Sequence, residues 1–294
     1  MNTSVQLPVY RYWHRAGRTL WFVYAVQGEP IRAKRHTRPF GRDSAWDGGT
    51  TKQMNAQTKG SMVERKSLVL FQPVVDAQTH CIVSCATVSA RPRFTVAGQD
   101  SHNAMELEDW NDALRCLHAC RTLDCNLSLL APVSEQQLRS PTFIVQALRS
   151  LEELQIPASC IELEIVERVA MGDASFMIGR LTALRQSGFS IVIDKLGSGY
   201  STVSQLLDMP STGLRIDEAL TRRAQARGGA ALIEAILRIA LVRGLRTIAA
   251  GVQDADAAAV LSLLGVNRLQ GNFFGSAVDC HDFMQQLSSE SHVH

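Results

Sequence analysis

Residues 181–200 read LTALRQSGFSIVIDKLGSGY, and this stretch indicates how the chain folds. Leucines at its first and fourth positions have the spacing of a buried helix face, and Gly188 supplies the left-handed residue with which many helices end. The apolar run at residues 189–194 then has the length and the β-branched composition of a buried strand, and it ends in Asp194. The stretch therefore predicts a helix followed by a strand of a parallel sheet.

This helix–strand unit recurs from residue 68 onwards, because helical patterns also end at Gly244 and Gly265, each followed by an apolar run. Strands are predicted at residues 68–74, 81–88, 124–129, 160–166, 189–194, 213–216, 245–250 and 267–271. Buried helix faces are predicted from Leu107, Trp110, Leu114 and Leu117; Ile144, Leu148 and Leu151; Met177, Leu181 and Leu184; Ile233, Ile236 and Ala240; and Ala257, Val260 and Leu264. Eight strands separated by helices favour an α/β fold with a closed TIM-type barrel over an open sheet.

The composition is that of a globular protein, with 294 residues, 46% hydrophobic residues and 20% charged residues. No apolar run reaches the roughly 18 residues of a membrane helix, and the first residues lack the pattern of a secretory signal. We therefore expect a soluble, cytoplasmic protein without membrane insertion. The seven cysteines contain no Cys-x-x-Cys pair, so reduced thiols are expected in place of a disulfide framework or a zinc site.

Charge divides the chain into a basic N-terminal part and an acidic remainder. Residues 1–67 hold 12 Lys and Arg against 4 Asp and Glu, and the remainder of the 30 and 28 is 18 against 24. This predicts a basic extension and linker over residues 1–67, a barrel over 68–287 and a tail over 288–294. The extension is interpreted as solvated or partly disordered, with an arm that contacts nucleic acid, an acidic partner or the barrel as the alternative.

Polar side chains end several of the predicted strands. These residues are Asn126, Glu164, Glu167, Asp194 and Gln270. Because reactive groups of parallel barrels lie at the carboxyl ends of the strands, we expect these side chains to share one mouth. Carboxylate and amide oxygens of this kind suit Mg²⁺ or Mn²⁺.

Six ordered motifs give the barrel region a family resemblance. They are FQPVVD at 71–76, NLS at 126–128, IELEIVE at 161–167, DKLGSGYS at 194–201, LRID at 214–217 and LQGNFFG at 269–275. In this order they resemble the EAL-domain family of bacterial cyclic di-GMP phosphodiesterases. The resemblance implies a modified TIM-type barrel that hydrolyses cyclic di-GMP with a metal-activated water.

The same resemblance identifies positions at which this chain departs from the family. Residues 86–88 read Ala-Thr-Val where the family has Glu-Ala-Leu, so Ala86 replaces the first metal ligand. Lys195 replaces a carboxylate ligand of the second metal, and Ala250 and Gln253 stand at two further acidic positions. Arg215 replaces the lysine that would position the attacking water. Asn126, Glu164, Glu167 and Asp194 therefore remain as vestigial metal-site positions.

These departures predict that the chain has lost phosphodiesterase activity and carries no Mg²⁺ or Mn²⁺, because two-metal hydrolysis requires both ions. Glu164 and Glu167 are expected to pair with Arg215 or Lys195; a cation held with Asn126 and Asp194 is the alternative. We expect a regulator in cyclic di-GMP signalling that contacts an unidentified protein partner, and the family's habit suggests a homodimer.

Two alternatives to this function stay open. In the first, the chain is a metal-independent cyclic di-GMP receptor, whose nucleotide-binding residues would be Gln72, Lys195, Arg215 and Gln270. In the second, a weak residual phosphodiesterase activity persists, and it would depend on Mn²⁺ or Mg²⁺.

Overall fold

The computed structural model describes residues 9–16, 19–26, 32–36, 69–89, 105, 107–122, 127–196 and 203–290. The chain divides into two compact units, Met1–Met62 and Val63–His294. The described residues include neither the boundary predicted after residue 67 nor the linker predicted over residues 41–67. Residues 291–294 of the predicted tail also lie outside them. Each unit is described by itself.

The N-terminal unit contains a three-stranded antiparallel sheet in the order β1-β2-β3. Its strands are β1 (Val9–Ala16), β2 (Thr19–Val26) and β3 (Arg32–His36). The strands predicted from the sequence began at residue 68, so these three strands were not among them. The signal was present, because β2 reads TLWFVYAV, rich in the β-branched and aromatic residues that favour strands. Gly17 and Arg18 separate β1 from β2 in the sequence, a spacing typical of hairpins.

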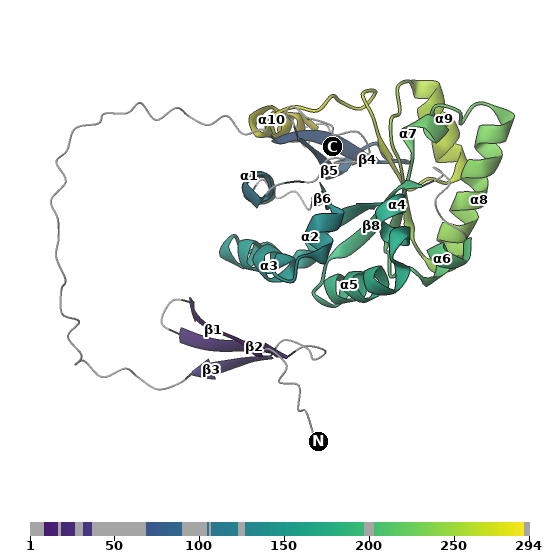
Figure 1. The fold of residues 1–294 in the computed structure, drawn as a ribbon. Coiled ribbons are helices and arrows are strands. Elements are labelled where there is room, and N and C mark those ends of the chain that lie inside the picture. Colours follow the sequence, from purple (N-terminus) through teal and green to yellow (C-terminus); the bar gives the residue numbers. More distant parts are fainter. Residues whose placement is uncertain are drawn as a thin grey trace, which may run out of the picture. The chain divides into compact units, whose positions relative to one another are not determined.

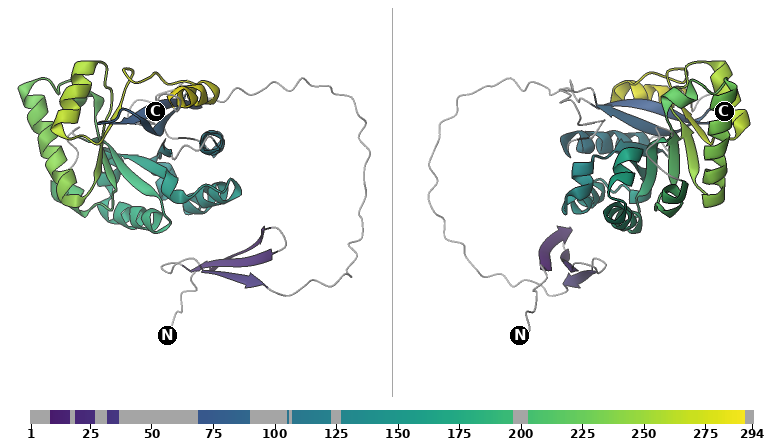
Figure 2. Two further views of the ribbon diagram at one scale, coloured as in Figure 1. Left: turned by 180° about the vertical axis from the view of Figure 1, so that it is seen from behind. Right: turned by 45° about the vertical axis from the view of Figure 1, so that its right-hand side comes forward.

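The second unit is a closed eight-stranded barrel in the order β10-β11-β4-β5-β6-β7-β8-β9 (Figures 1 and 2). The strands are β4 (Val69–Asp76), β5 (Ile82–Ser89), β6 (Ser128–Pro132), β7 (Ile161–Val166), β8 (Ser190–Leu196), β9 (Gly213–Ile216), β10 (Arg246–Ala249) and β11 (Arg268–Gln270). β4 runs antiparallel to both of its neighbours, β5 and β11, and the other neighbouring pairs are parallel. The predicted barrel is confirmed, with one antiparallel strand as its modification.

One strand lies later in the sequence than predicted. The sequence predicts its end at Leu129, whereas β6 extends to Pro132. Proline is tolerated at the end of a strand, where its missing N–H removes no internal ladder bond, so Ala131 and Pro132 do not end the strand early.

Helices follow the strands and surround the barrel (Figure 1). They are α1 (Leu107–Arg121), α2 (Glu135–Arg139), α3 (Phe143–Glu153), α4 (Glu167–Gly172), α5 (Ala174–Gln186), α6 (Val203–Asp208), α7 (Glu218–Thr221), α8 (Arg227–Arg243), α9 (Ala255–Leu264) and α10 (Cys280–Glu290), with a 3-10 turn at Ala158–Cys160. Leu107 is a predicted face residue whose side chain the structure does not describe, and the other residues of the predicted helix faces pack into the core. Gly244 and Gly265 cap α8 and α9 with φ of 62° and 94°, as the sequence predicts.

The inside of the barrel is separated from the layer between strands and helices. Val74, Ala86, Leu130, Val192 and Ile248 come from five different strands and form a cluster of their own. Because successive side chains of a strand alternate between its two faces, residues two positions away from these also face the interior. This alternation brings charged residues of several strands into the barrel at its two ends.

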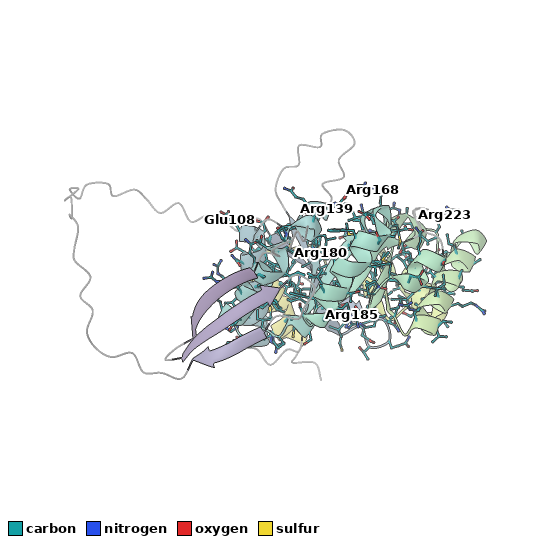
Figure 3. All side chains as sticks on the ribbon, turned by 60° about the horizontal axis from the view of Figure 1, so that its bottom comes forward. Glu108, Arg139, Arg168, Arg180, Arg185 and Arg223 are labelled. Carbon is teal, nitrogen blue, oxygen red and sulfur yellow. A yellow bond between two sulfur atoms is a disulfide. The ribbon has the colours of Figure 1, made fainter. Side chains whose placement is uncertain are left out.

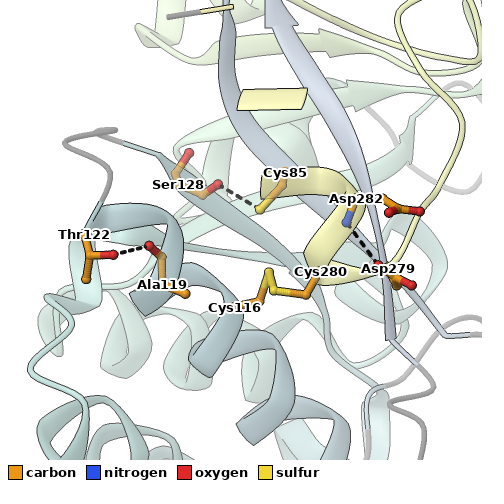
Figure 4. The surroundings of a disulfide bond; sticks show 8 residues. All are labelled: Cys85, Cys116, Ala119, Thr122, Ser128, Asp279, Cys280 and Asp282. Atoms are coloured by element: carbon orange, nitrogen blue, oxygen red, sulfur yellow. Dashed lines mark hydrogen bonds between the residues drawn. A yellow bond between two sulfur atoms is a disulfide. The ribbon is translucent and has the colours of Figure 1, made fainter. Parts of the chain in front are cut away.

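The structure contains a disulfide that the sequence analysis did not predict. Cys116 of α1 bonds to Cys280 of α10, with 5.8 Å between their Cα atoms (Figure 4). The two cysteines are 164 residues apart, so their spacing gives no sign of the pairing. α1 and α10 both contact β4, and this shared neighbour brings the cysteines together. The prediction that all thiols stay reduced is therefore corrected for this pair.

Within the described part of the chain, no helix combines the length and the apolar character that crossing a membrane requires.

Candidate functional site

A guanidinium group lies between two carboxylates at the mouth of the barrel. Glu164 comes from β7, Asp194 from β8 and Arg215 from β9. Arg215 Nη1 donates to Asp194 Oδ1 at 2.9 Å, and Arg215 Nε lies 3.4 Å from Glu164 Oε1. The side chains are 17% exposed for Arg215 and 6% for Glu164, so both ion pairs are largely removed from water. The predicted pairing of Glu164 with Arg215 is therefore present.

Amide side chains extend this cluster across the mouth. Arg215 Nη2 donates to Gln270 Oε1 at 2.7 Å, and Gln270 Nε2 donates to Gln72 Oε1 at 2.8 Å. Gln72 Nε2 in turn donates to Asn272 Oδ1 at 3.2 Å and to the Gly275 carbonyl at 3.1 Å. Gln72 reaches this end because β4 runs antiparallel to its neighbours. Three of the four residues predicted for nucleotide binding thus form one continuous network.

Burial and charge oppose each other at Glu164. Burial raises the pKa of Glu164 to about 7; the Arg215 guanidinium lowers this pKa, and the carboxylates of Asp194 and Glu162 raise it. Burial lowers the pKa of Arg215, but Asp194 and Glu164 together raise it above its ordinary value. Arg215 therefore keeps its positive charge at every physiological pH, and it is the fixed charge of the mouth.

The fourth predicted nucleotide-binding residue, Lys195, lies beside this cluster in an unusual backbone conformation. Its φ is 58°, a left-handed value that residues other than glycine seldom adopt. In this conformation the Lys195 N–H donates to Asp194 Oδ1 at 2.7 Å. The carboxylate of Asp194 thus accepts from the Lys195 backbone and from Arg215 at the same oxygen.

The remaining predicted positions differ in their surroundings. Ala86 and Ala250 are buried, at 2% and 8% exposure, and their methyl groups offer no ligand atom. Gln253 is exposed. Glu167 is buried as the first residue of α4, directly after β7. Asn126 lies outside the described residues.

The residues of the mouth do not fit a divalent cation. Metal sites for Mg²⁺ or Mn²⁺ are built from several oxygen ligands around the ion, and the two carboxylates at this mouth already hold Arg215 between them. Nowhere in the part of the chain that the structure describes do three His, Cys, Asp or Glu side chains converge in a way that could hold a metal ion. Arg215 is the cation that contacts both of these carboxylates.

A second charged cluster lies at the opposite end of the barrel, and the sequence analysis missed it. Glu162, two residues before Glu164 on β7, is 1% exposed. It accepts hydrogen bonds from Ser128 Oγ and from Arg268 Nη1 at 2.7 Å, and Arg246 Nη2 lies 3.3 Å from its other oxygen. The alternation of Glu162 and Glu164 in a strand of otherwise apolar residues was the signal that could have placed both carboxylates inside the barrel.

Comparison with known proteins places this geometry in a family. The EAL domain family matches residues 106–277, more than half of the chain. The chain belongs to the EAL domain family. β4 and β5, with Gln72 and Ala86, lie outside the matched residues but complete the same closed barrel.

Individual relatives agree with this assignment. The chain is 30% identical over 168 residues to the cyclic di-GMP phosphodiesterase PA2567 of Pseudomonas aeruginosa, covering 56% of this chain and 29% of the relative. It is 27% identical over 164 residues to the cyclic di-GMP phosphodiesterase PdeR of Escherichia coli, covering 55% and 25%. The chain thus spans less than a third of the length of either relative.

A solved structure shares the fold. The EAL domain of Mycobacterium smegmatis DcpA superposes with a TM-score of 0.66 and 24% sequence identity, and the alignment covers 76% of this chain and 96% of that domain.

Proposed function

We propose that this chain is a non-hydrolytic EAL domain that acts in cyclic di-GMP signalling as a regulator, through contacts with a protein partner. The observation that carries the proposal is the position of Arg215, which pairs with both Glu164 and Asp194 where a hydrolytic site would need free carboxylates. The names of the relatives, which are cyclic di-GMP phosphodiesterases, support the signalling system.

The charge balance of the mouth supports the loss of hydrolysis. Two unit charges about 4 Å apart interact with roughly 4 kcal/mol at an effective dielectric constant near 20, so a divalent cation beside Arg215 would be strongly repelled. Hydrolysis with two metals needs one ion to generate hydroxide and a second to stabilise the leaving oxygen. Ala86 and Ala250 supply neither ion with a ligand.

Exposed apolar side chains support a role in protein contacts. Leu241 and Val242 at the end of α8 are each 81% exposed, and Leu263 near the end of α9 is 87% exposed. α8 and α9 pack against each other, so these side chains lie on neighbouring helices. Exposed apolar side chains that gather into one patch mark surfaces that another protein covers. The partner is unidentified, and a second copy of this chain is one of the alternatives.

The metal-independent receptor is the second candidate function. Arg215 and the amides of Gln72 and Gln270 offer a polar surface at the mouth, with Phe273 43% exposed close to Asn272. However, both terminal nitrogens of Arg215 already donate to protein oxygens. A nucleotide phosphate would have to compete with these bonds, which makes the receptor the weaker candidate.

Calorimetric titration of the full chain with cyclic di-GMP tests these candidates. The titration is carried out once with EDTA and once with Mn²⁺. We expect no heat that depends on Mn²⁺, because the mouth does not fit the metal. Saturable binding in EDTA, weakened by Lys195→Gln and unchanged by the surface control Arg149→Gln, would establish the receptor and contradict a function through protein contacts alone. Binding that requires Mn²⁺ would contradict the proposal as a whole.

A further inference from the structure

We propose that a groove at the amino-terminal end of the barrel binds a small anion that carries at least two phosphate groups. The groove has a volume of about 610 Å³. Its walls come from the end of α5, from the segment before β9 and from the junction between α8 and β10. It shares no residue with the mouth, so this proposal is independent of the proposed function.

The groove lies at the end of the barrel opposite to the mouth. Arg185 is in the last turn of α5, which leads into the start of β8, and Arg243 and Arg246 flank the start of β10. Figure 3 shows Arg185 at the opposite edge of the barrel from Arg168 and Arg223, which follow the carboxyl ends of β7 and β9. A ligand here would not touch Arg215 or Asp194.

The charge of the groove is positive. Its lining residues include three arginines, Arg185, Arg243 and Arg246, and no acidic residue. Arg246 pairs with Glu162 at 3.3 Å, yet its side chain remains 42% exposed. Arginine is suited to phosphate because its planar fork can donate two parallel hydrogen bonds.

Two of the arginines converge on one short segment of backbone. Arg185 Nη1 donates to the Ser211 carbonyl at 3.3 Å, and Arg243 Nη2 donates to the Met209 carbonyl at 3.0 Å. Carbonyls two residues apart lie within about 7 Å even in a fully extended chain. Each guanidinium carries five N–H groups, so these contacts leave donors on both arginines for an anion that spans them.

A buried hydroxyl in the same wall lacks a partner. Ser211 is 6% exposed, and among the residues that the structure describes its Oγ has no hydrogen-bond partner. The neighbouring Thr212 differs, because its Oγ1 accepts from the Ile191 N–H and donates to the Ile191 carbonyl, each at 2.9 Å. Buried hydroxyls are nearly always hydrogen-bonded, so Ser211 is an unusual residue in the wall of this groove.

The number of arginines favours a ligand with two phosphate groups. α5 and α8 both end at the groove, and the carboxyl end of a helix carries partial negative charge, which helps to hold the arginines. This partial charge opposes every anion, so the guanidinium groups must supply the attraction. An anion with two phosphate groups can contact more than one guanidinium, which a single phosphate does less readily.

Calorimetric titration of the full chain with inorganic pyrophosphate, with inorganic phosphate and with ADP tests the proposal. We expect pyrophosphate to bind at one site, and phosphate to bind at least tenfold more weakly. ADP equal to pyrophosphate would identify the diphosphate as the recognised group, and tighter ADP binding would identify a nucleotide; both support the proposal. The absence of saturable binding of pyrophosphate and ADP at millimolar concentration would overturn it.

Matched variants locate the site. Arg243→Gln and the more exposed Arg185→Gln should each weaken pyrophosphate binding at least tenfold, since each removes one guanidinium. Arg243→Lys, which keeps the charge, should bind more tightly than Arg243→Gln and guards against loss of folding. Arg149→Gln on the surface and Lys195→Gln at the mouth should bind as the wild type does. Equal loss in the Arg149 and Arg243 variants, or loss in the Lys195 variant alone, would refute the site.

Discussion

Arg215 is the residue on which the character of the mouth depends. It places one positive charge beside the two carboxylates of Glu164 and Asp194. It also donates to Gln270, which in turn donates to Gln72 and so connects Arg215 to β4. A lysine has a compact ammonium on a flexible stem, and it could not make these contacts from one planar group. The contacts therefore explain why an arginine, and no smaller cation, fits this position.

Removing this charge should destabilise the fold. Arg215→Met leaves the two carboxylates buried without a cation, and breaking a buried ion pair in this way costs about 3–5 kcal/mol. Urea unfolding of the wild type and the variant measures the difference. Arg149→Met is the matched control, because Arg149 pairs with Glu153 on an exposed surface of α3 and such pairs contribute less than about 1 kcal/mol. Equal losses in both variants would contradict the role of Arg215.

Glu164 should give the stability a dependence on pH. Burial raises its pKa to about 7 from an ordinary value of 4.5. Between these two pH values the folded chain holds a proton that the unfolded chain has lost, so the free energy of unfolding falls as the pH rises from 4.5 to about 7. Glu164→Gln cannot titrate and should remove this part of the fall, whereas the exposed Glu153→Gln should not. Urea unfolding across this pH range tests it, and identical slopes in all three proteins would contradict it.

At the level of single residues, part of the site could be read from the sequence. Glu164, Asp194 and Gln270 each lie in the carboxyl-terminal half of a strand, and this position identified them as residues of the mouth. Asn272 and the hydrogen bond from Gln72 could not be predicted, because both depend on β4 entering the barrel in the antiparallel direction. Glu162 was missed because it begins its strand, and only strand ends were considered.

At the level of elements, α1 and α10 form a covalently linked pair on the outside of β4. The Cys116–Cys280 disulfide joins them across 164 residues, so it closes most of the barrel into one loop. Linking residues this far apart restricts the unfolded chain more than the folded one. The disulfide thus holds the last helix of the barrel against the first.

Breaking this link should lower stability by about 2–5 kcal/mol, the usual cost of losing a native disulfide. Thermal unfolding of the wild type should shift to lower temperature in dithiothreitol. The double variant Cys116→Ser with Cys280→Ser should unfold at this lower temperature with or without the reductant. Thiol titration of the denatured, unreduced chain should give no more than five thiols, the seven cysteines less the two in the disulfide. Seven titratable thiols without reductant would contradict the pairing.

The elements of the barrel were predictable because each carries a local signal. Gly244 and Gly265 mark helix ends, and short apolar runs between amphipathic patterns mark strands. Ser134 and Gln137 form a capping box, in which the side chain of each accepts from the backbone N–H of the other. This was also a local signal, and it was not used to predict α2. The disulfide had none, since it arises from two helices that meet only in the folded chain.

For the molecule as a whole, the division into two units leads to a test by truncation. The barrel closes on itself through β10 and β9 without any strand from the N-terminal sheet. A chain that lacks residues 1–62 should therefore unfold cooperatively, at a midpoint within a few degrees of the full chain. Circular dichroism measures the unfolding of both chains. Loss of cooperative unfolding in the truncated chain would show that the barrel depends on the first unit.

We propose that an EAL barrel with Arg215 between its carboxylates does not hydrolyse cyclic di-GMP. Chromatography of the nucleotide after prolonged incubation with the full chain in Mn²⁺, and separately in Mg²⁺, tests it most directly. We predict that the cyclic nucleotide is recovered unchanged in both cases. Formation of the linear dinucleotide in either metal, abolished by EDTA and by Asp194→Asn, would show that the mouth still assembles a metal site and would contradict the account.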